Sequence, residues 1–273
     1  MTLKIVSAWV GHKPEIISRV VENHRIYALK HRYDCTFFDE DSVRAPDPLI
    51  SDSSINAPWV KIAVIRKALE TSERVFWVDA DSVFYRPNST LRFLETCSAN
   101  LVFTGDRNDI CNTGHLFFRR SDFSRRFLDS WETLRTIPFP PLATTHQDPN
   151  GLVADQPAFN YLLGGGKSQR DFVEQHSERI FNRLNGWNGN PDRVFKNFAR
   201  THAPVRRANL RRAKTLIDPA LRKDIRIVSQ TRINAYPWWG PAKGSGNRKG
   251  PIVHFVSPWK DMLDDFFEME GQN

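Results

Sequence analysis

The 273-residue sequence predicts an α/β fold in which helices flank a sheet with a parallel core. Short apolar runs of strand length alternate with segments whose apolar residues recur at helical spacing, and this alternation through the first half of the chain is typical of parallel sheets. Hydrophobic residues make up 40% of the chain, which is enough for a sizeable packed core. The length fits one large domain or two small ones.

The expected elements follow from these signals in chain order. Leu3 to Val10 has the length of a buried strand, and a helix begins at Pro14, because the fixed φ and missing N–H of proline suit the first helical turn. A second short strand is expected over 34–39, and a loop rich in Pro, Asp and Ser over 40–58. The next helix covers about 59–71, where apolar residues recur at helical spacing.

An apolar strand that stops at acidic residues is expected within 74–84. The later elements are strands at 101–104, 115–119, 225–229 and 252–256 and helices at 123–134 and 154–163, with an acidic helix closing the chain.

Composition excludes several classes of protein. The longest uncharged run is the 12 residues from Thr136 to Gln147, whereas a membrane span needs about 20 apolar residues, so no transmembrane anchor is expected. The apolar run at the N-terminus contains Lys4 and ends at Gly11, which does not match a signal peptide. The 3 cysteines are odd in number and lack metal-ligand spacing, so they predict no disulfide framework. We therefore expect a soluble protein, with a cytoplasmic location favoured.

Positive charge is concentrated in one segment. The chain has 39 Lys and Arg against 31 Asp and Glu, a net charge of +8, and residues 206–226 hold eight of these cations and only two acids. Such a segment can attract an anionic membrane surface or a phosphorylated ligand, or it can be a solvated helical face or a mobile loop. No aromatic residue lies within it to stack a base, so we expect no nucleic acid partner, whereas peripheral membrane contact through 206–226 stays open.

The tripeptide Asp79-Ala-Asp81 is the strongest candidate for chemistry. Four apolar residues lead directly into it, and residues i and i+2 of an extended chain point to the same side, so the two carboxylates can converge. Ligands of open α/β sheets bind outside the carboxyl ends of strands, which is where this pair is expected. Two like charges there are costly unless a cation neutralises them, and carboxylate oxygens suit Mg²⁺ or Mn²⁺, ions that also hold diphosphates. The alternative is a pair of solvated turn residues.

A phosphohydrolase with an aspartate nucleophile is a rival interpretation of the same acids. Such enzymes also place an acid at a strand end with a second acid two residues later. Their strand is normally the first of the domain, whereas two strands and two helices come before Asp79 here. The later acids Asp264 and Asp265 are expected in a helix instead of at a strand end.

Several blocks of the sequence form a recognisable series. They are Asn23–Tyr33, Trp59–Leu69 with Val75–Phe84, Asn112–Arg120 with Phe127–Trp131, Asp155–Ala158, Val228–Tyr236 and Val253–Val256. In content and order these blocks, which span most of the chain between Asn23 and Lys260, resemble retaining glycosyltransferases with a GT-A fold. They are most similar to the family of yeast-type galactosyl- and mannosyltransferases and plant xyloglucan xylosyltransferases.

This resemblance implies a Rossmann-like mixed sheet flanked by helices in a single domain over 1–273. A nucleotide-sugar-binding half would cover 1–110 and an acceptor-binding half 111–273. The implied reaction moves a hexose or pentose from a nucleotide-diphosphate sugar to a glycan or other hydroxyl acceptor, with retention of the anomeric configuration. A UDP-sugar is favoured over GDP-mannose as the donor, and Mn²⁺ (or Mg²⁺) is the implied cofactor.

The resemblance also implies the residues that hold the metal and the donor. Asp79 and Asp81 would bind Mn²⁺ with His254 as the third protein ligand, and neutral imidazole is compatible with that ion. Without the family, a histidine in a short apolar strand is more often a hydrogen-bonded core residue. Lys61 would lie near the donor, although a surface lysine of an amphipathic helix would have the same spacing. Asn112 and Gly114 would border the sugar pocket, and Ser7 and Trp9, at the end of the first strand, are expected near the base from topology alone.

The remaining implied roles concern the reaction itself. Asp155 and Gln156 would sit at the reactive face of the sugar, although an Asp is also favoured in the first turn of a helix. Lys260 would contact the diphosphate. The family pattern H-F-x-G-C-K departs here to His254-Phe-Val-Ser-Pro-Trp-Lys260, which lacks the Gly and places the Lys one residue later.

Aromatic residues of the second half suggest an acceptor platform. Trp187, Trp259 and the segment Tyr236 to Gly240 fall in loop-like stretches where sugar rings could stack, although Trp is also common in cores. A non-enzymatic alternative is a basic binding module whose metal site has lost turnover and which grips an anionic partner through 206–226.

Overall fold

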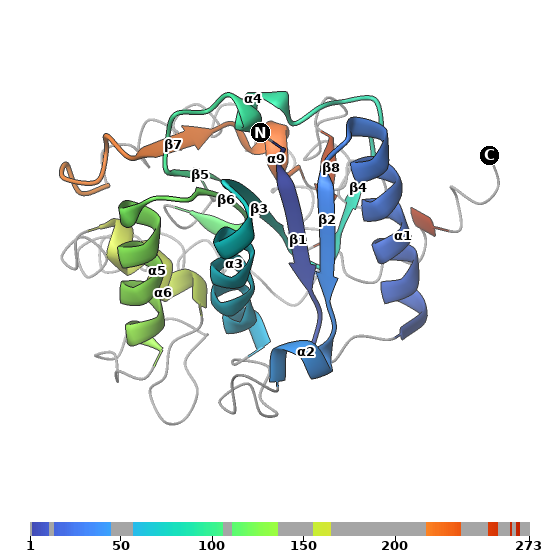
Figure 1. The fold of residues 1–273 in the computed structure, drawn as a ribbon, viewed down its shortest axis with the longest axis horizontal. Helices are drawn as coiled ribbons and strands as arrows, with labels where there is room; N and C mark the ends of the chain where they lie inside the picture. The colour runs from blue at the N-terminus through green and yellow to red at the C-terminus, as the bar shows by residue number, and fades with distance from the viewer. Residues whose placement is uncertain are drawn as a thin grey trace, which may run out of the picture.

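The computed structural model describes residues 2–10, 14–44, 57–105, 111–135, 155–164, 217–235 and 251–255, together with Leu263, Phe266 and Phe267. Within these residues, six strands form a central sheet in the order β2-β1-β3-β6-β5-β7 (Figure 1). They are β1 (Lys4–Ala8), β2 (Asp34–Phe38), β3 (Arg74–Val78), β5 (Leu101–Thr104), β6 (Asn112–Arg119) and β7 (Ile225–Val228).

The sheet is mixed because one inner strand is reversed. β6 runs antiparallel to its neighbours β3 and β5, whereas β1 pairs in parallel with β2 and β3, and β5 with β7. As a result, the carboxyl ends of β1, β3, β5 and β7 and the amino end of β6 lie at the same edge of the sheet. The predicted α/β fold with a parallel core is confirmed, with the reversed β6 as the departure from a purely parallel order.

A second, two-stranded sheet pairs β4 (Ser82–Phe84) in antiparallel fashion with β8 (Ile252–His254). The apolar run 74–84 therefore contributes strands to two different sheets. The break falls at the acidic residues, where the Ser82 N–H donates to the Asp79 carbonyl at 3.1 Å and turns the chain.

Helices cover both faces of the central sheet (Figure 1). Alternate side chains of β3 point to opposite faces of the sheet and pack into two separate buried clusters. Val75 and Trp77 belong to the first cluster, and Phe76 and Val78 belong to the second. The first cluster contains residues of α3 (Val60–Thr71), α5 (Asp122–Leu134) and α6 (Asp155–Leu163), and the second contains residues of α1 (Pro14–His31), α4 (Arg92–Glu95), α9 (Gln230–Ile233) and the small sheet.

Most of the expected elements lie within two residues of their predicted bounds, and one correction concerns the loop expected over 40–58. Glu40–Arg44 forms α2 and Ala57–Trp59 a short 3₁₀ helix, η2, so that α3 begins at Val60. The side chain of Asp39 accepts a hydrogen bond from the Ser42 N–H at 2.9 Å, as a helix N-cap does, and Val43 is buried in the core.

A second correction matters for the site. The strand expected at 115–119 begins three residues earlier, at Asn112, and pairs through Thr104 and Asn112 with the end of β5. Of the acidic C-terminal helix, the described residues Leu263 and Phe266 pack against Val253 and Phe255. Among the residues that the structure describes, no helix combines the length and apolar character needed to cross a membrane.

Candidate active site

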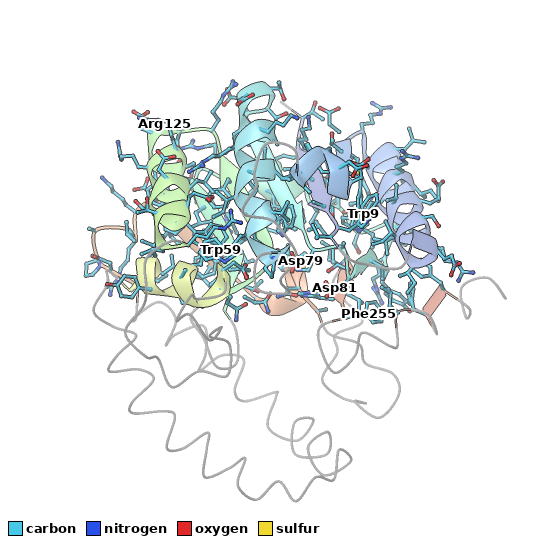
Figure 2. The ribbon with its side chains drawn as sticks, turned by 90° about the horizontal axis from the view of Figure 1, so that it is seen from below. Trp9, Trp59, Asp79, Asp81, Arg125 and Phe255 are labelled. Atoms are coloured by element: carbon cyan, nitrogen blue, oxygen red, sulfur yellow. The ribbon has the colours of Figure 1, made fainter. Side chains whose placement is uncertain are left out.

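The candidate site lies at the edge of the central sheet where β1, β3, β5 and β7 end and β6 begins. Figure 2 shows Asp79 and Asp81 at this edge of the described chain. The strand order explains the convergence, since the Val78↔His115 pairing puts the residues that follow β3 beside the first residues of β6. The acids after β3 and the polar start of β6 are thereby neighbours in space, although neither position is close to the other in the sequence.

Asp79 is held by the strands on both sides of it. Its backbone N–H donates to the Gly114 carbonyl at 2.9 Å, which extends the pairing of β3 with β6 by one residue. Its Oδ1 accepts a hydrogen bond of 2.6 Å from Nε1 of Trp77, a buried residue of β3. One carboxylate oxygen is therefore fixed against the sheet, and Oδ2 is the oxygen that faces His254.

His254 reaches the acids through the small sheet. Pairing of Ser82 with His254 places the histidine beside the residue that follows Asp81, and the Phe255 N–H donates to the Asp81 carbonyl at 2.8 Å. Nε2 of His254 lies 3.0 Å from Oδ1 of Asp81 and 3.8 Å from Oδ2 of Asp79. The two acids and a histidine more than 170 residues later in the sequence thus turn one ligand atom each toward the same point.

These three side chains fit a divalent metal ion. Their ligand atoms all lie within 4.8 Å of one another, and a set of two carboxylates and one imidazole suits Mn²⁺. Burial alone would lower the pKa of His254, but Asp81 and Asp79 together outweigh this effect, and the pKa lies above its ordinary value. The two acids therefore favour positive charge at this point.

Lys61 connects this group to a third carboxylate. The ammonium lies 2.7 Å from Oδ2 of Asp155 and 3.5 Å from Oδ1 of Asp79, and only 3% of the side chain is exposed. Burial alone would lower its pKa, but the two carboxylates outweigh burial and raise the pKa of Lys61 to about 12. Lys61 is thus a buried structural cation, and the alternative of a surface lysine on an amphipathic helix is wrong.

Asp155 and Gln156 are the first two residues of α6, and both form hydrogen bonds with the start of β6. The hydroxyl of Thr113 donates to Oδ2 of Asp155 at 2.8 Å, and the Thr113 N–H donates to Oε1 of Gln156 at 3.2 Å. On the other side, Nε1 of Trp131 in α5 donates to the Asp155 carbonyl at 3.0 Å. The first turn of α6 is therefore fixed beside Lys61 and Asp79.

Asn112 and Gly114 are the residues before and after Thr113 in β6. The side chain of Asn112 accepts a hydrogen bond of 2.9 Å from the Gly114 N–H, within the first residues of β6. Both residues therefore lie at the same edge of the sheet as the acids.

The two residues expected near the base lie at the neighbouring strand end. Ser7, in β1, is 1% exposed, and its hydroxyl has no hydrogen-bond partner among the described residues. Trp9 follows β1. The centroid of its ring lies 5.2 Å from that of Phe37, and its backbone N–H donates to the Phe38 carbonyl at 3.3 Å.

Several predicted features lie outside the described residues. These are Lys260, the acceptor-platform candidates Trp187, Trp259 and Tyr236 to Gly240, and residues 206–216 of the basic segment. In the remainder of that segment, Arg222, Lys223 and Arg226 are exposed.

Four residues of the site were not singled out from the sequence: Trp77, Thr113, His115 and Asn234. Asn234 binds Nδ1 of His254 at 2.8 Å, and the ring of His115 stands edge-on to that of His254 with centroids 5.0 Å apart. Burial holds the pKa of His115 well below its ordinary value, so this ring is neutral. No pattern in the sequence indicated these contacts.

Comparison with known proteins shows similarity to glycosyltransferases in the fold. Residues 6–96 match the model of the galactosyl transferase GMA12/MNN10 family, and no curated protein sequence matches the chain. A solved glycosyltransferase involved in the glycosylation of the major capsid of PBCV-1 is similar over 98% of this chain and 100% of its own, with 15% identity and a TM-score of 0.54.

Two further solved structures are similar. The bifunctional glycosyltransferase WbbM has 9% identity and a TM-score of 0.50 over 98% of this chain and 49% of its own. The galactosyltransferase LgtC, solved with donor and acceptor sugar analogues, has 10% identity and a TM-score of 0.42 over 98% of this chain and 95% of its own.

Proposed function

We propose that the chain is a glycosyltransferase that moves a hexose or pentose from a nucleotide-diphosphate sugar to a hydroxyl of a glycan or other acceptor. Its fold is similar to that of a solved glycosyltransferase, and residues 6–96 match the model of the galactosyl transferase GMA12/MNN10 family. We further propose that the reaction needs a divalent metal and retains the anomeric configuration. We prefer this reaction to the phosphohydrolase interpretation of the same acids because the family match and the similar fold both point to glycosyltransferases.

The proposed metal dependence is supported by the closeness of the ligand atoms of Asp79, Asp81 and His254. These residues would hold Mn²⁺ or Mg²⁺, which when bound would supply positive charge to a nucleotide-diphosphate leaving group. The acids alone would repel a diphosphate, so a donor of this class is compatible with the site only in company with a cation.

The ion pair of Lys61 with Asp155 supports a role in placing the sugar. Transfer through a cationic sugar-like transition state is helped by negative or dipolar groups that are already fixed when the donor binds. Asp155 and Gln156 are fixed in this way, by Lys61 and Thr113. We propose that they face the reactive side of the sugar, and that Lys61, Asn112 and Gly114 border it.

We propose that retention results from approach of the acceptor hydroxyl on the side of the leaving group. In that scheme the departing phosphate oxygen accepts the proton of the acceptor, so the chain need not supply a separate base. The rules that relate carboxylate separation to stereochemistry in hydrolases do not apply to this scheme.

For the donor we propose a UDP-sugar, with the base at the end of β1. The half-buried ring of Trp9 offers an aromatic face, and the buried hydroxyl of Ser7 offers a hydrogen bond that no described residue takes. Lys260 would contact the diphosphate. The donor would lie mainly on residues 1–110 and the acceptor on 111–273.

Thermal unfolding of the full chain tests donor binding. Wild type and Asp81→Asn are compared with UDP, GDP and ADP, each with Mn²⁺ or with EDTA. A ligand at about 100 times its Kd stabilises the folded state by roughly 2.7 kcal/mol, which raises the Tm of a chain of this length by several degrees. We expect UDP to raise the Tm only with Mn²⁺ and only in wild type.

Other outcomes have a defined meaning. A shift with GDP instead of UDP would change the proposed donor and leave the proposed reaction intact. No shift with any nucleotide, together with salt-dependent binding of polyanions, would contradict the proposed function and favour a binding module.

A further inference from the structure

The two ring nitrogens of His254 have different partners, and this difference reveals how the ring is aimed. Nε2 faces Asp81 at 3.0 Å, and Nδ1 faces Oδ1 of Asn234 at 2.8 Å. We propose that Asn234 and Gly114 are positioning residues that hold the His254 ring with Nε2 directed at the metal site. This inference rests on the metal dependence in the proposed function.

Asn234 determines which nitrogen carries the proton. An amide oxygen can only accept, so Nδ1 of His254 must be the N–H donor of this hydrogen bond. Neutral His254 therefore keeps its lone pair on Nε2, on the side of Asp79 and Asp81. A histidine ligand needs this tautomer, which is commonly set by the hydrogen bond of its other nitrogen.

The amide of Asn234 is itself fixed. Its Nδ2 donates to Oγ1 of Thr104, at the end of β5, over 3.4 Å, and the side chain is completely buried. This contact orients the amide with its oxygen toward His254. Asn234 therefore links the carboxyl end of the central sheet to the metal site.

The backbone next to Asn234 holds the backbone of His254. The His254 N–H donates to the Ala235 carbonyl at 2.8 Å. Two consecutive residues after α9 thus bind the main chain and the ring of the same histidine. The Cα of His254 is fixed by these contacts and by the β4–β8 pairing, and its ring orientation is left to the surrounding side chains.

Gly114 makes room for the ring in that orientation. A Cβ at position 114 would overlap Cε1 of His254 and lie 2.8 Å from its Nδ1 and 3.0 Å from Oδ1 of Asn112. The strand cannot withdraw, because the Gly114 carbonyl accepts the Asp79 N–H. A side chain at this position would push the imidazole away from the acids. The absent Cβ thus serves the metal ligand, in addition to any room it leaves for a sugar.

Mn²⁺ binding to the full chain tests this inference without depending on turnover. The Kd is measured by calorimetry for wild type, Asn234→Leu, Asn234→Asp and Gly114→Ala. Asn100→Leu is the matched control, since Asn100 is also buried and hydrogen-bonded, to Arg119 and Asp224, outside the site. Electron spin echo modulation of bound Mn²⁺ reports whether an imidazole nitrogen is a ligand.

We expect Asn234→Leu and Gly114→Ala to weaken Mn²⁺ binding by roughly 10- to 100-fold and to lose the nitrogen modulation. Asn234→Asp keeps an oxygen acceptor for Nδ1, so its Kd should stay within a few-fold of wild type. Asn100→Leu should lower the Tm without changing the Kd or the modulation.

Two results would overturn the inference, and they have different consequences for the proposed function. Wild-type affinity and nitrogen modulation in Asn234→Leu and Gly114→Ala would refute the positioning role while leaving the metal site intact. If wild type itself bound no Mn²⁺, the metal dependence of the proposed function would be refuted and the inference with it.

Discussion

The Nζ of Lys61 lies 2.7 Å from Oδ2 of Asp155, so a buried salt bridge joins the first turns of α3 and α6 across the start of β6. Thr113 binds both partners, since its carbonyl accepts from Lys61 at 3.3 Å and its hydroxyl donates to Asp155. Breaking a buried pair of this kind leaves one buried charge without that partner.

Lys61→Met should therefore lower the free energy of unfolding by about 3–5 kcal/mol, measured by urea denaturation. The double variant Lys61→Met/Asp155→Asn removes both charges, so it should be clearly more stable than the sum of the single changes. Strict additivity of the two single changes would show that the pair contributes no coupling energy.

Trp77 and Trp131 allow a matched comparison at the site. Both are buried tryptophans, but Nε1 of Trp77 donates to Oδ1 of Asp79 and that of Trp131 to the Asp155 carbonyl. Replacing either by Phe should destabilise the fold by roughly 1–3 kcal/mol, because a buried acceptor loses its donor. Trp77→Phe should also weaken Mn²⁺ binding, since Asp79 is no longer held with Oδ2 toward His254.

Calorimetric titration of Mn²⁺ into the two variants checks this difference. A Kd that changes equally in Trp77→Phe and Trp131→Phe would show that the Trp77 contact to Asp79 has no specific effect on the metal site.

The sequence was sufficient to predict the order of the main elements. Each of β1, β3 and β5 is a short apolar run, and each of α1, α3 and α5 has a regular apolar stripe, so local patterns specify them. The acids after β3 could be placed at a strand end by the same argument, and the family resemblance indicated His254 and Lys61.

Contacts that depend on strand order could not be predicted. The reversed direction of β6 brings Thr113 to Asp155, and the β4–β8 pairing brings His254 to Asp81. No local pattern specifies the direction of a strand or its partner. For the same reason the burial of Lys61 was not evident, because helical spacing shows which residues share a face and not which acids lie opposite them.

The buried residue His24 predicts a pH dependence of stability. Its Nε2 lies 2.9 Å from the Ser82 carbonyl, and its ring packs against Phe37 and Phe84. Burial lowers the pKa of His24 to about 4, only partly opposed by the hydrogen bond to Ser82. As the pH falls below about 6.5, the unfolded chain binds a proton here that the folded chain does not, so stability is lost between pH 6.5 and 4.

The loss from this group is on the order of 3 kcal/mol. His24→Gln keeps an N–H donor for the carbonyl and cannot titrate, so the difference in unfolding free energy between the two proteins should change over this pH range. Urea denaturation at pH 7, 5.5 and 4 measures it. Parallel curves for wild type and His24→Gln would contradict the assignment.

The proposed function requires that this chain transfers sugar from a nucleotide-diphosphate donor at a site that depends on Asp81. The most direct test is NMR of donor consumption and of the anomeric configuration of the product, with UDP-galactose, UDP-glucose, UDP-xylose and GDP-mannose, Mn²⁺ or EDTA, and a mixture of glycan acceptors. We predict that one donor forms a glycoside with retained configuration, at a rate that falls by at least about 100-fold with EDTA or in Asp81→Asn. Donor consumption that is independent of both Mn²⁺ and Asp81, or no consumption of any donor, would contradict it.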